Sequence, residues 1–375
     1  MYAARNRDED VRKKSSSGGV FSLIAESIIK QGGVVFGARF DDSFEVVLDV
    51  AASLEQLDAF RGSKYLQAIV GDSYKNCKVL LDAGRPVLFT GTPCQISGLL
   101  HFLRKPYPNL LTIDFICHGV PSPEVWRNYL KEVVSSGKQA LRDAKFRKSR
   151  RGWKRYGFAF DYDTTEHLAT FYSSFEKNPY IQAFLKNVIL RPSCYACPAK
   201  NGSSMSDLTL ADFWGIEHLA PELDDDIGTS LVIVHTEKGR SFIPFDKLKS
   251  KRMGNEALQY NPSYFSSSIP NPNRDGFFHN FSKSKNLNYT LVKYSRTSFR
   301  TRVFSFIYKL LGSDSVSNSN SKNGILSTRK WHNGCVLNPD INLDDYYPVK
   351  VSFRDKTIGW KHYLLKIAMV RIKEK

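Results

Sequence analysis

The sequence of 375 residues lacks the marks of a membrane or secreted protein. It contains no run of ~18 uninterrupted apolar residues, which excludes an ordinary membrane-spanning helix. The first ten residues hold no apolar segment and so do not form a secretory signal. Hydrophobic residues nevertheless make up 42% of the chain, enough for a sizeable core. We therefore expect a folded, cytoplasmic protein.

The basic charge of the chain is not accompanied by a recognisable nucleic-acid-binding motif. The formal net charge is +17, and residues 281–375 supply 18 Lys/Arg against 6 Asp/Glu, a net +12. A basic segment of this kind attracts an anionic membrane surface or an acidic protein, and an ordinary solvated surface is the alternative. We expect no nucleic acid as a partner and expect peripheral membrane contact through the basic tail.

Apolar runs typical of strands alternate with helical patterns over the first 140 residues. Helices are predicted at 20–30, 74–83 and 95–103, and strands at 34–38, 44–50, 86–90 and 110–117. This alternation predicts an α/β fold with a mixed, largely parallel sheet and flanking helices. Residues 141–280 read as a second, α+β domain, and 281–375 as a short basic tail with a Ser/Asn-rich linker at 313–323.

Cysteine is scarce, with six residues in the chain, and four of them occupy informative positions. In a large chain of this class, so few cysteines favour metal binding or catalysis over a disulfide scaffold. Cys194 and Cys197 form a CxxC pair. Cys94 and Cys117 each lie near the carboxyl end of a predicted strand, where α/β sheets bind ligands. Four thiolates suit either a [4Fe–4S] cluster or structural zinc.

Two glycine- and hydroxyl-rich segments precede predicted helices, although neither is a GxGxxG or P-loop motif. They are residues 15–19 and the pair Gly91-Thr92. Backbone N–H groups at helix starts bind phosphates, and a tight turn with an N-cap is the alternative interpretation. Residues 61–65 add cations and an aromatic ring that can contact a dinucleotide. His118 can hydrogen-bond a cofactor or move a proton, and a structural role is the alternative.

Several short motifs occur in an order that resembles a known family. They are Ser15-Ser16-Ser17-Gly18-Gly19, Arg61-Gly62-Ser63-Lys64-Tyr65, Gly91-Thr92-Pro93-Cys94-Gln95, Cys117-His118-Gly119-Val120-Pro121, Phe146-Arg147, Gly152-Trp153-Lys154, Cys194-Tyr195-Ala196-Cys197 and Asp212-Phe213-Trp214-Gly215. The chain resembles the beta subunits of coenzyme F420 hydrogenases and dehydrogenases over residues 2–278. It is most similar to the branch found in bacterial surface-polysaccharide gene clusters.

The resemblance implies an iron–sulfur flavoprotein with FAD and a [4Fe–4S] cluster, acting as an oxidoreductase subunit on an unidentified small molecule. It places Cys94, Cys117, Cys194 and Cys197 at the metal and His118 at the catalytic site. The residues expected to contact FAD are Ser17, Gly18, Gly19, Ser63, Lys64, Tyr65, Gly91, Thr92 and Gly119.

Many members of this family carry an N-terminal ferredoxin-like segment with two CxxCxxC runs, which this sequence does not contain. We therefore expect a ferredoxin-like or other redox partner protein. The resemblance also implies a role in polysaccharide biosynthesis. A zinc-stabilised, non-catalytic binding protein that uses the same four cysteines is the alternative function.

Overall fold

A computed structural model of the chain describes residues 1–134, 141–163 and 167–296. The Ser/Asn-rich linker, most of the basic tail and Cys335 lie outside these residues. In the first part of the chain, the elements are β1 (Tyr2–Asn6), α1 (Glu9–Lys14), α2 (Val20–Lys30), β2 (Val34–Phe40), β3 (Val46–Ala51), α3 (Ser73–Asp82), β4 (Val87–Thr90), α4 (Pro93–Leu103), β5 (Leu110–Phe115) and α5 (Pro123–Val134).

After residue 140, the helices of the described chain are shorter than α2, α3, α4 and α5. The elements there are β6 (Leu141–Ser149), β7 (Tyr156–Asp163), β8 (Leu168–Ser174), α6 (Pro179–Leu185), β9 (Leu208–Asp212), α7 (Ile216–Leu219), β10 (Ser230–Val234), α8 (Glu237–Ser241), β11 (Leu248–Arg252), α9 (Arg274–Phe281) and α10 (Leu287–Ser295). No helix in the described part of the chain is long and apolar enough to cross a membrane.

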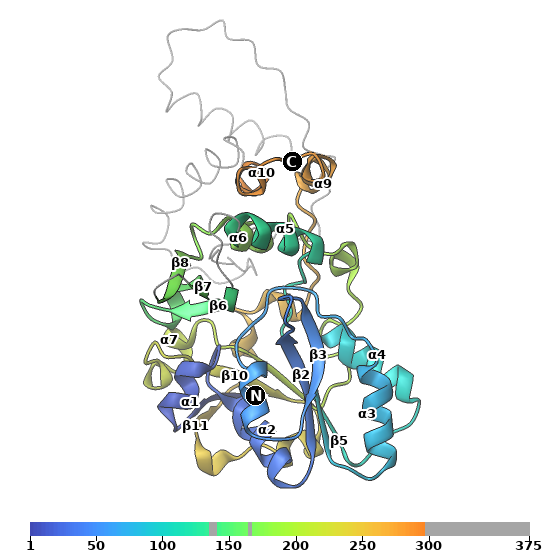
Figure 1. The fold of residues 1–375 in the computed structure, drawn as a ribbon. Helices are drawn as coiled ribbons and strands as arrows, with labels where there is room; N and C mark the ends of the chain where they lie inside the picture. The colour runs from blue at the N-terminus through green and yellow to red at the C-terminus, as the bar shows by residue number, and fades with distance from the viewer. Residues whose placement is uncertain (135–140, 164–166, 297–375) are drawn as a thin grey trace, which may run out of the picture. The chain divides into compact units, whose positions relative to one another are not determined.

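Eight strands form a mixed sheet in the order β11-β1-β10-β9-β5-β4-β2-β3 (Figure 1). The four strands β2, β4, β5 and β9 pair in parallel, and the strands on either side of them pair antiparallel. The predicted α/β class, with a mixed sheet and flanking helices, is confirmed. Its parallel part is limited to the central strands.

Helices cover both faces of the large sheet, as the alternation of side chains in its strands requires. On one face, Val35, Leu88 and Leu111 are buried in a core that includes α2. On the other face, Phe36 and Phe89 are buried with side chains of α3 and α4. The helix predicted at 20–30 is confirmed as α2.

A second sheet, in the order β6-β7-β8, packs with an aromatic core. Trp126 of α5 lies in this core against Phe146 and Phe158, and its Nε1–H donates to the Phe44 carbonyl at 2.7 Å. Strands β9, β10 and β11 belong to the large sheet, so residues 141–280 contribute to both sheets. The boundary expected at residue 140 lies between β5 of the large sheet and β6 of the small sheet, and the chain returns to the large sheet at β9.

Hydrogen bonds hold residues 15–19 against strands β1 and β10. The Asn6 N–H donates to the Gly18 carbonyl at 2.7 Å, and the Gly18 N–H donates to Ser230 Oγ at 3.0 Å. A Cβ at Gly18 would lie 2.3 Å from the Ala4 oxygen, so only glycine allows this close approach.

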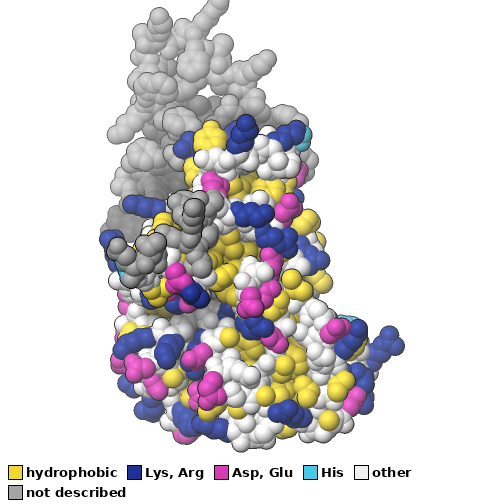
Figure 2. Space-filling model, viewed as in Figure 1, with side chains coloured by type: hydrophobic (Ala, Val, Ile, Leu, Met, Phe, Trp, Pro, Cys, Tyr) yellow, Lys and Arg dark blue, Asp and Glu magenta, His cyan; other side chains and the backbone are white. Residues whose placement is uncertain are grey.

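An ion-pair cluster holds the N-terminal elements to the loop before β10. Asp225 is 2.6 Å from both Arg5 and Arg12, and the Arg12 side chain is only 3% exposed. Arg12 also donates to the Gly228 carbonyl at 3.0 Å. The same loop contacts the 15–19 segment, because a Cβ at Gly228 would lie 3.0 Å from the Ser17 carbonyl carbon. On the face of the molecule drawn in Figure 2, Lys and Arg side chains lie among Asp and Glu side chains.

We predict that Asp225→Asn lowers the free energy of unfolding by about 2–3 kcal/mol. This is less than the ~3–5 kcal/mol of a fully buried pair because Asp225 is partly exposed. Urea denaturation followed by circular dichroism measures the change. The matched variant Asp10→Asn, whose carboxylate is 89% exposed, should cost under ~1 kcal/mol. Equal losses in the two variants would show that the cluster does not stabilise the fold.

Candidate functional site

Cys94 lies in the first turn of α4, directly after β4. Thr92 is the N-cap of this helix, and Pro93 begins it. The Gln95 side chain accepts from the Thr92 N–H at 2.9 Å, and Thr92 Oγ1 lies 3.2 Å from the sulfur of Cys94. The sequence Gly-Thr-Pro-Cys-Gln is therefore a capped helix start that exposes a cysteine.

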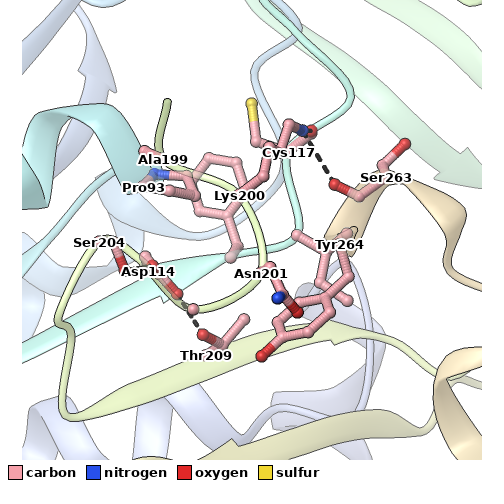
Figure 3. A pocket seen from close by; sticks show the side chains of 13 residues that line it. Pro93, Asp114, Cys117, Ala199, Lys200, Asn201, Ser204, Thr209, Ser263 and Tyr264 are labelled. Atoms are coloured by element: carbon pink, nitrogen blue, oxygen red, sulfur yellow. Dashed lines mark hydrogen bonds between the residues drawn. The ribbon is translucent and has the colours of Figure 1, made fainter. Parts of the chain in front are cut away.

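Cys117 follows the adjacent parallel strand, β5, and borders a small pocket that also includes Pro93. The Lys200 ammonium donates to the Cys117 carbonyl at 2.6 Å and to the Ser263 carbonyl at 2.9 Å, and Figure 3 shows this side chain between the two segments. Burial raises the pKa of the Cys117 thiol to about 12, although the charge of Lys200 opposes the rise.

Cys194 lies in the short 3-10 helix Pro192–Ala196, and Cys197 follows it. Gly119 lets the two cysteine segments approach, because a Cβ there would meet Leu190 at 2.8 Å and the Cβ of Cys194 at 3.4 Å. Burial raises the pKa of Cys194, and the charges of Cys94 and Cys197 raise it further.

The four predicted cysteines are therefore near neighbours. Cys94 and Cys194 each affect the pKa of Cys117, and Cys94 and Cys197 affect that of Cys194. As the side chains are placed, however, no group of three or more His, Cys, Asp or Glu residues in the described ranges is arranged to hold a metal ion. The four thiols therefore do not form a ligand set in this arrangement.

His118 is next to Cys117, but its ring points into the protein. The ring packs edge-on against Phe184 with centroids 5.1 Å apart, and the buried Nε2 has no hydrogen-bond partner among the described residues. Burial lowers the pKa of His118, which favours the neutral ring. Its catalytic role stays a prediction.

Residues 15–19 and 61–65, which are both expected to contact FAD, lie against each other. The Ser63 N–H donates to Ser16 Oγ at 2.6 Å, and the two hydroxyls are 2.9 Å apart. Gly19 is the N-cap of α2 and provides no side-chain cap, so the first N–H groups of this helix have no side-chain acceptor from the cap. Both features agree with a phosphate site at this helix start.

Lys64 is expected to contact FAD, but in the structure its ammonium lies within its own loop. Its ammonium donates to three carbonyls of its own loop, those of Ala59, Arg61 and Gly62, at 3.0, 2.9 and 3.2 Å. Although the side chain as a whole is only half-buried, desolvation lowers the pKa of this ammonium to about 7. Lys64 thus closes the loop that presents Ser63 and Tyr65.

Gly91 and Thr92 lie at the start of α4, directly before Cys94. No hydrogen bond within the described residues joins them to the 15–19 or 61–65 segments. Phe184 nevertheless connects the two groups. Its ring stacks on Tyr65 with centroids 4.8 Å apart and meets the His118 ring edge-on at 5.1 Å. One aromatic ring therefore contacts both the expected flavin segment and the residue next to Cys117.

The sequence analysis did not select Arg147, which the structure places among several of the motifs. Its guanidinium forms an ion pair with Asp212 and lies 4.4 Å from the Tyr156 ring centroid. It is 5.5 Å from the rings of both Trp153 and Trp214, which stack on each other. Of the members of this cluster, Arg147, Trp153, Asp212 and Trp214 belong to the family-like motifs, whereas Tyr156 does not.

Asp114 is another buried group that the sequence analysis did not select. It accepts hydrogen bonds from Ser204 and Thr209, as Figure 3 shows for Thr209, and burial raises its pKa. These bonds tie β5 to β9 and to the loop before β9, beneath the Cys117 pocket.

Comparison with known proteins identifies the family. The model of the coenzyme F420 hydrogenase/dehydrogenase beta subunit N-terminus matches residues 1–71, and that of the C-terminus of the same subunit matches residues 84–252. The chain belongs to this family, so the resemblance to oxidoreductase subunits is confirmed.

A similar solved structure is the xenon-derivatised F420-reducing [NiFe] hydrogenase complex from Methanosarcina barkeri. It shares 16% identity with a TM-score of 0.46, and the match covers 76% of this chain and 93% of that chain. A search of curated proteins found no match.

We predict that the metal-free chain is alkylated at Cys94 much faster than at Cys117. Cys94 is exposed, whereas a pKa of about 12 leaves only about one Cys117 thiol in ten thousand ionised at pH 8, and the thiolate is the reactive form. Mass spectrometry after timed iodoacetamide treatment measures both rates. The Cys117 rate should rise about tenfold per pH unit. Equal rates at pH 8 would show that the thiol of Cys117, which is partly exposed, does not have this raised pKa.

Proposed function

We propose that the chain is an iron–sulfur flavoprotein subunit of an oxidoreductase, which passes electrons between a [4Fe–4S] cluster, FAD and a reducible partner or substrate. The observation that carries this proposal is the contact of Phe184 with Tyr65 and with His118. It brings the segment proposed to hold the flavin within one ring of the segment proposed to hold the cluster.

The donor set fits an iron–sulfur cluster by its chemistry. Cys94, Cys117, Cys194 and Cys197 supply four thiols, and thiolate is the ligand that such clusters prefer. Because burial raises the pKa of Cys117 and Cys194, both thiols hold their protons in the free chain and must release them on binding. Lys200 places a positive charge beside Cys117, which favours a negatively charged thiolate there.

The residues around the start of α2 fit the phosphate-bearing part of FAD. The uncapped N-terminus of the helix favours an anion, and Ser17, Gly18 and Gly19 form the loop in front of it. Tyr65 lies in the adjoining segment, where its ring stacks on Phe184. When bound, FAD exchanges electron pairs and the cluster exchanges single electrons, so together they match two-electron donors to one-electron carriers.

The partner and the biological setting follow from the same proposal. A subunit of this kind needs an electron carrier, and we propose a ferredoxin-like or other redox partner protein in the cytoplasm. The role in surface-polysaccharide biosynthesis rests on the resemblance to that branch of the family.

We predict that Cys197→Ser sharply lowers the bound iron of protein purified without oxygen and bleaches its absorption near ~400 nm, because a hydroxyl replaces a thiolate ligand. Iron and sulfide assays together with the visible spectrum measure the effect. Cys77→Ser is the matched control, since Cys77 is fully buried in the core that includes α3 and α4.

Two outcomes would contradict the proposal. Iron content that is the same in Cys197→Ser and in the unmodified protein would exclude Cys197 as a ligand. A colourless protein that contains zinc and no flavin would instead support the zinc-stabilised binding protein, which uses the same four thiols.

A further inference from the structure

Arg147 is a buried cation in strand β6 of the small sheet. Its side chain is only 4% exposed, and its Nη1 forms the ion pair with Asp212. The rings of Trp153, Tyr156 and Trp214 surround the guanidinium at 4.4–5.5 Å. Burial opposes the charge, but Asp212 and the nearby phenols raise the pKa of Arg147, so the group stays protonated.

Two nitrogens of this guanidinium lack a hydrogen bond of ordinary geometry. Nε and Nη2 are buried and make no such bond among the described residues, although a weaker hydrogen-bond interaction joins the guanidinium to the Tyr65 hydroxyl. A buried donor without a partner is costly, so such donors usually meet a ligand or a bound water. Since Asp212 engages only one of the three nitrogens, the guanidinium retains two donors for another molecule.

Trp153, whose ring lies beside the Arg147 guanidinium, is hydrogen-bonded to the segment proposed to bind FAD. The Trp153 Nε1–H donates to the Ser16 carbonyl at 2.8 Å, and Ser16 contacts Ser63. Tyr65, from the same segment, lies close enough to Arg147 for each to affect the pKa of the other.

We propose that Arg147 binds the flavin ring of FAD, with Nε and Nη2 donating to the carbonyl oxygens and ring nitrogens of its pyrimidine edge. This inference rests on the proposed function. A planar ring suits the aromatic surroundings of the donors. The Asp212 carboxylate already balances the guanidinium charge, so the site favours an uncharged acceptor over a phosphate. We assign the phosphates of FAD to the start of α2 instead.

The test compares Arg147→Gln and Arg147→Lys with Arg150→Gln. Arg150 also lies over an aromatic ring, that of Tyr172 at 4.4 Å, but it is exposed and provides a matched control. FAD binding is measured by fluorescence titration of the flavin-free protein. Loss of charge-assisted hydrogen bonds should raise the Kd about 10- to 150-fold in Arg147→Gln. Arg147→Lys should recover only part of this loss, because lysine lacks the planar fork. Arg150→Gln should bind as the unmodified protein does.

Two fragments of FAD separate ring binding from phosphate binding. Riboflavin carries the ring without phosphates, and ADP carries the phosphates without the ring. Arg147→Gln should weaken competition by riboflavin and leave competition by ADP unchanged. An equal loss for both fragments, or unchanged FAD affinity, would overturn the assignment of Arg147 to the ring. An unmodified protein that binds neither FAD nor riboflavin would instead refute the proposed function.

Hydrogen–deuterium exchange keeps the proposal testable if the Arg147 variants do not fold, which thermal melting will reveal. On addition of FAD to the unmodified chain, the backbone at 145–157 and 211–216 should become protected together with 15–19. Protection of 15–19 alone would overturn the inference while leaving flavin binding intact.

Discussion

Strands β4, β5 and β9 run in the same direction, so their carboxyl ends lie along one edge of the large sheet. The register pairs Thr90 with Ile113 and Phe115 with Leu210. Cys94 and Cys117, which follow β4 and β5, and Asp212, which ends β9, are therefore brought to the same edge although more than 100 residues separate the first from the last. Parallel sheets bind ligands at this edge, and the thiols and the Arg147 cluster both depend on this pairing.

Three ion pairs then join segments that are distant in the sequence. Arg12 and Arg5 bind Asp225, which holds the loop before β10 near the 15–19 segment. Arg147 binds Asp212, which joins the small sheet to β9 of the large one. A buried charge needs its partner, so pairs of this kind favour one relative placement of the segments over others. They position the two halves of the proposed site more than they add to its stability.

The aromatic side chains connect structure and proposed function. The core around Trp126 supports α6, and α6 carries Phe184 into contact with both Tyr65 and His118. In a dry, closely packed arrangement of this kind, two redox groups can lie near each other without exposure to water. The same packing turns the His118 ring away from solvent and lowers its pKa, which suits a neutral, structural ring better than a mobile proton carrier.

Local patterns in the sequence determined the secondary structure of the first half. Apolar periodicity predicted α2 at 20–30 and a helix at 95–103, which is α4 and begins two residues earlier at Pro93, because such patterns depend on residues within a few positions of one another. The CxxC spacing and the placement of Cys94 and Cys117 after strands also led to the expectation that the four thiols share one metal, which stays a prediction. The return of β9, β10 and β11 to the first sheet was not predicted, since strand pairing across about 200 residues leaves no local trace. Only the tertiary structure decided that Lys64 turns into its own loop and that Arg147 keeps two buried donors free. Both facts depend on which carbonyls and carboxylates the folded chain brings within hydrogen-bond distance, and residue spacing does not determine these distances.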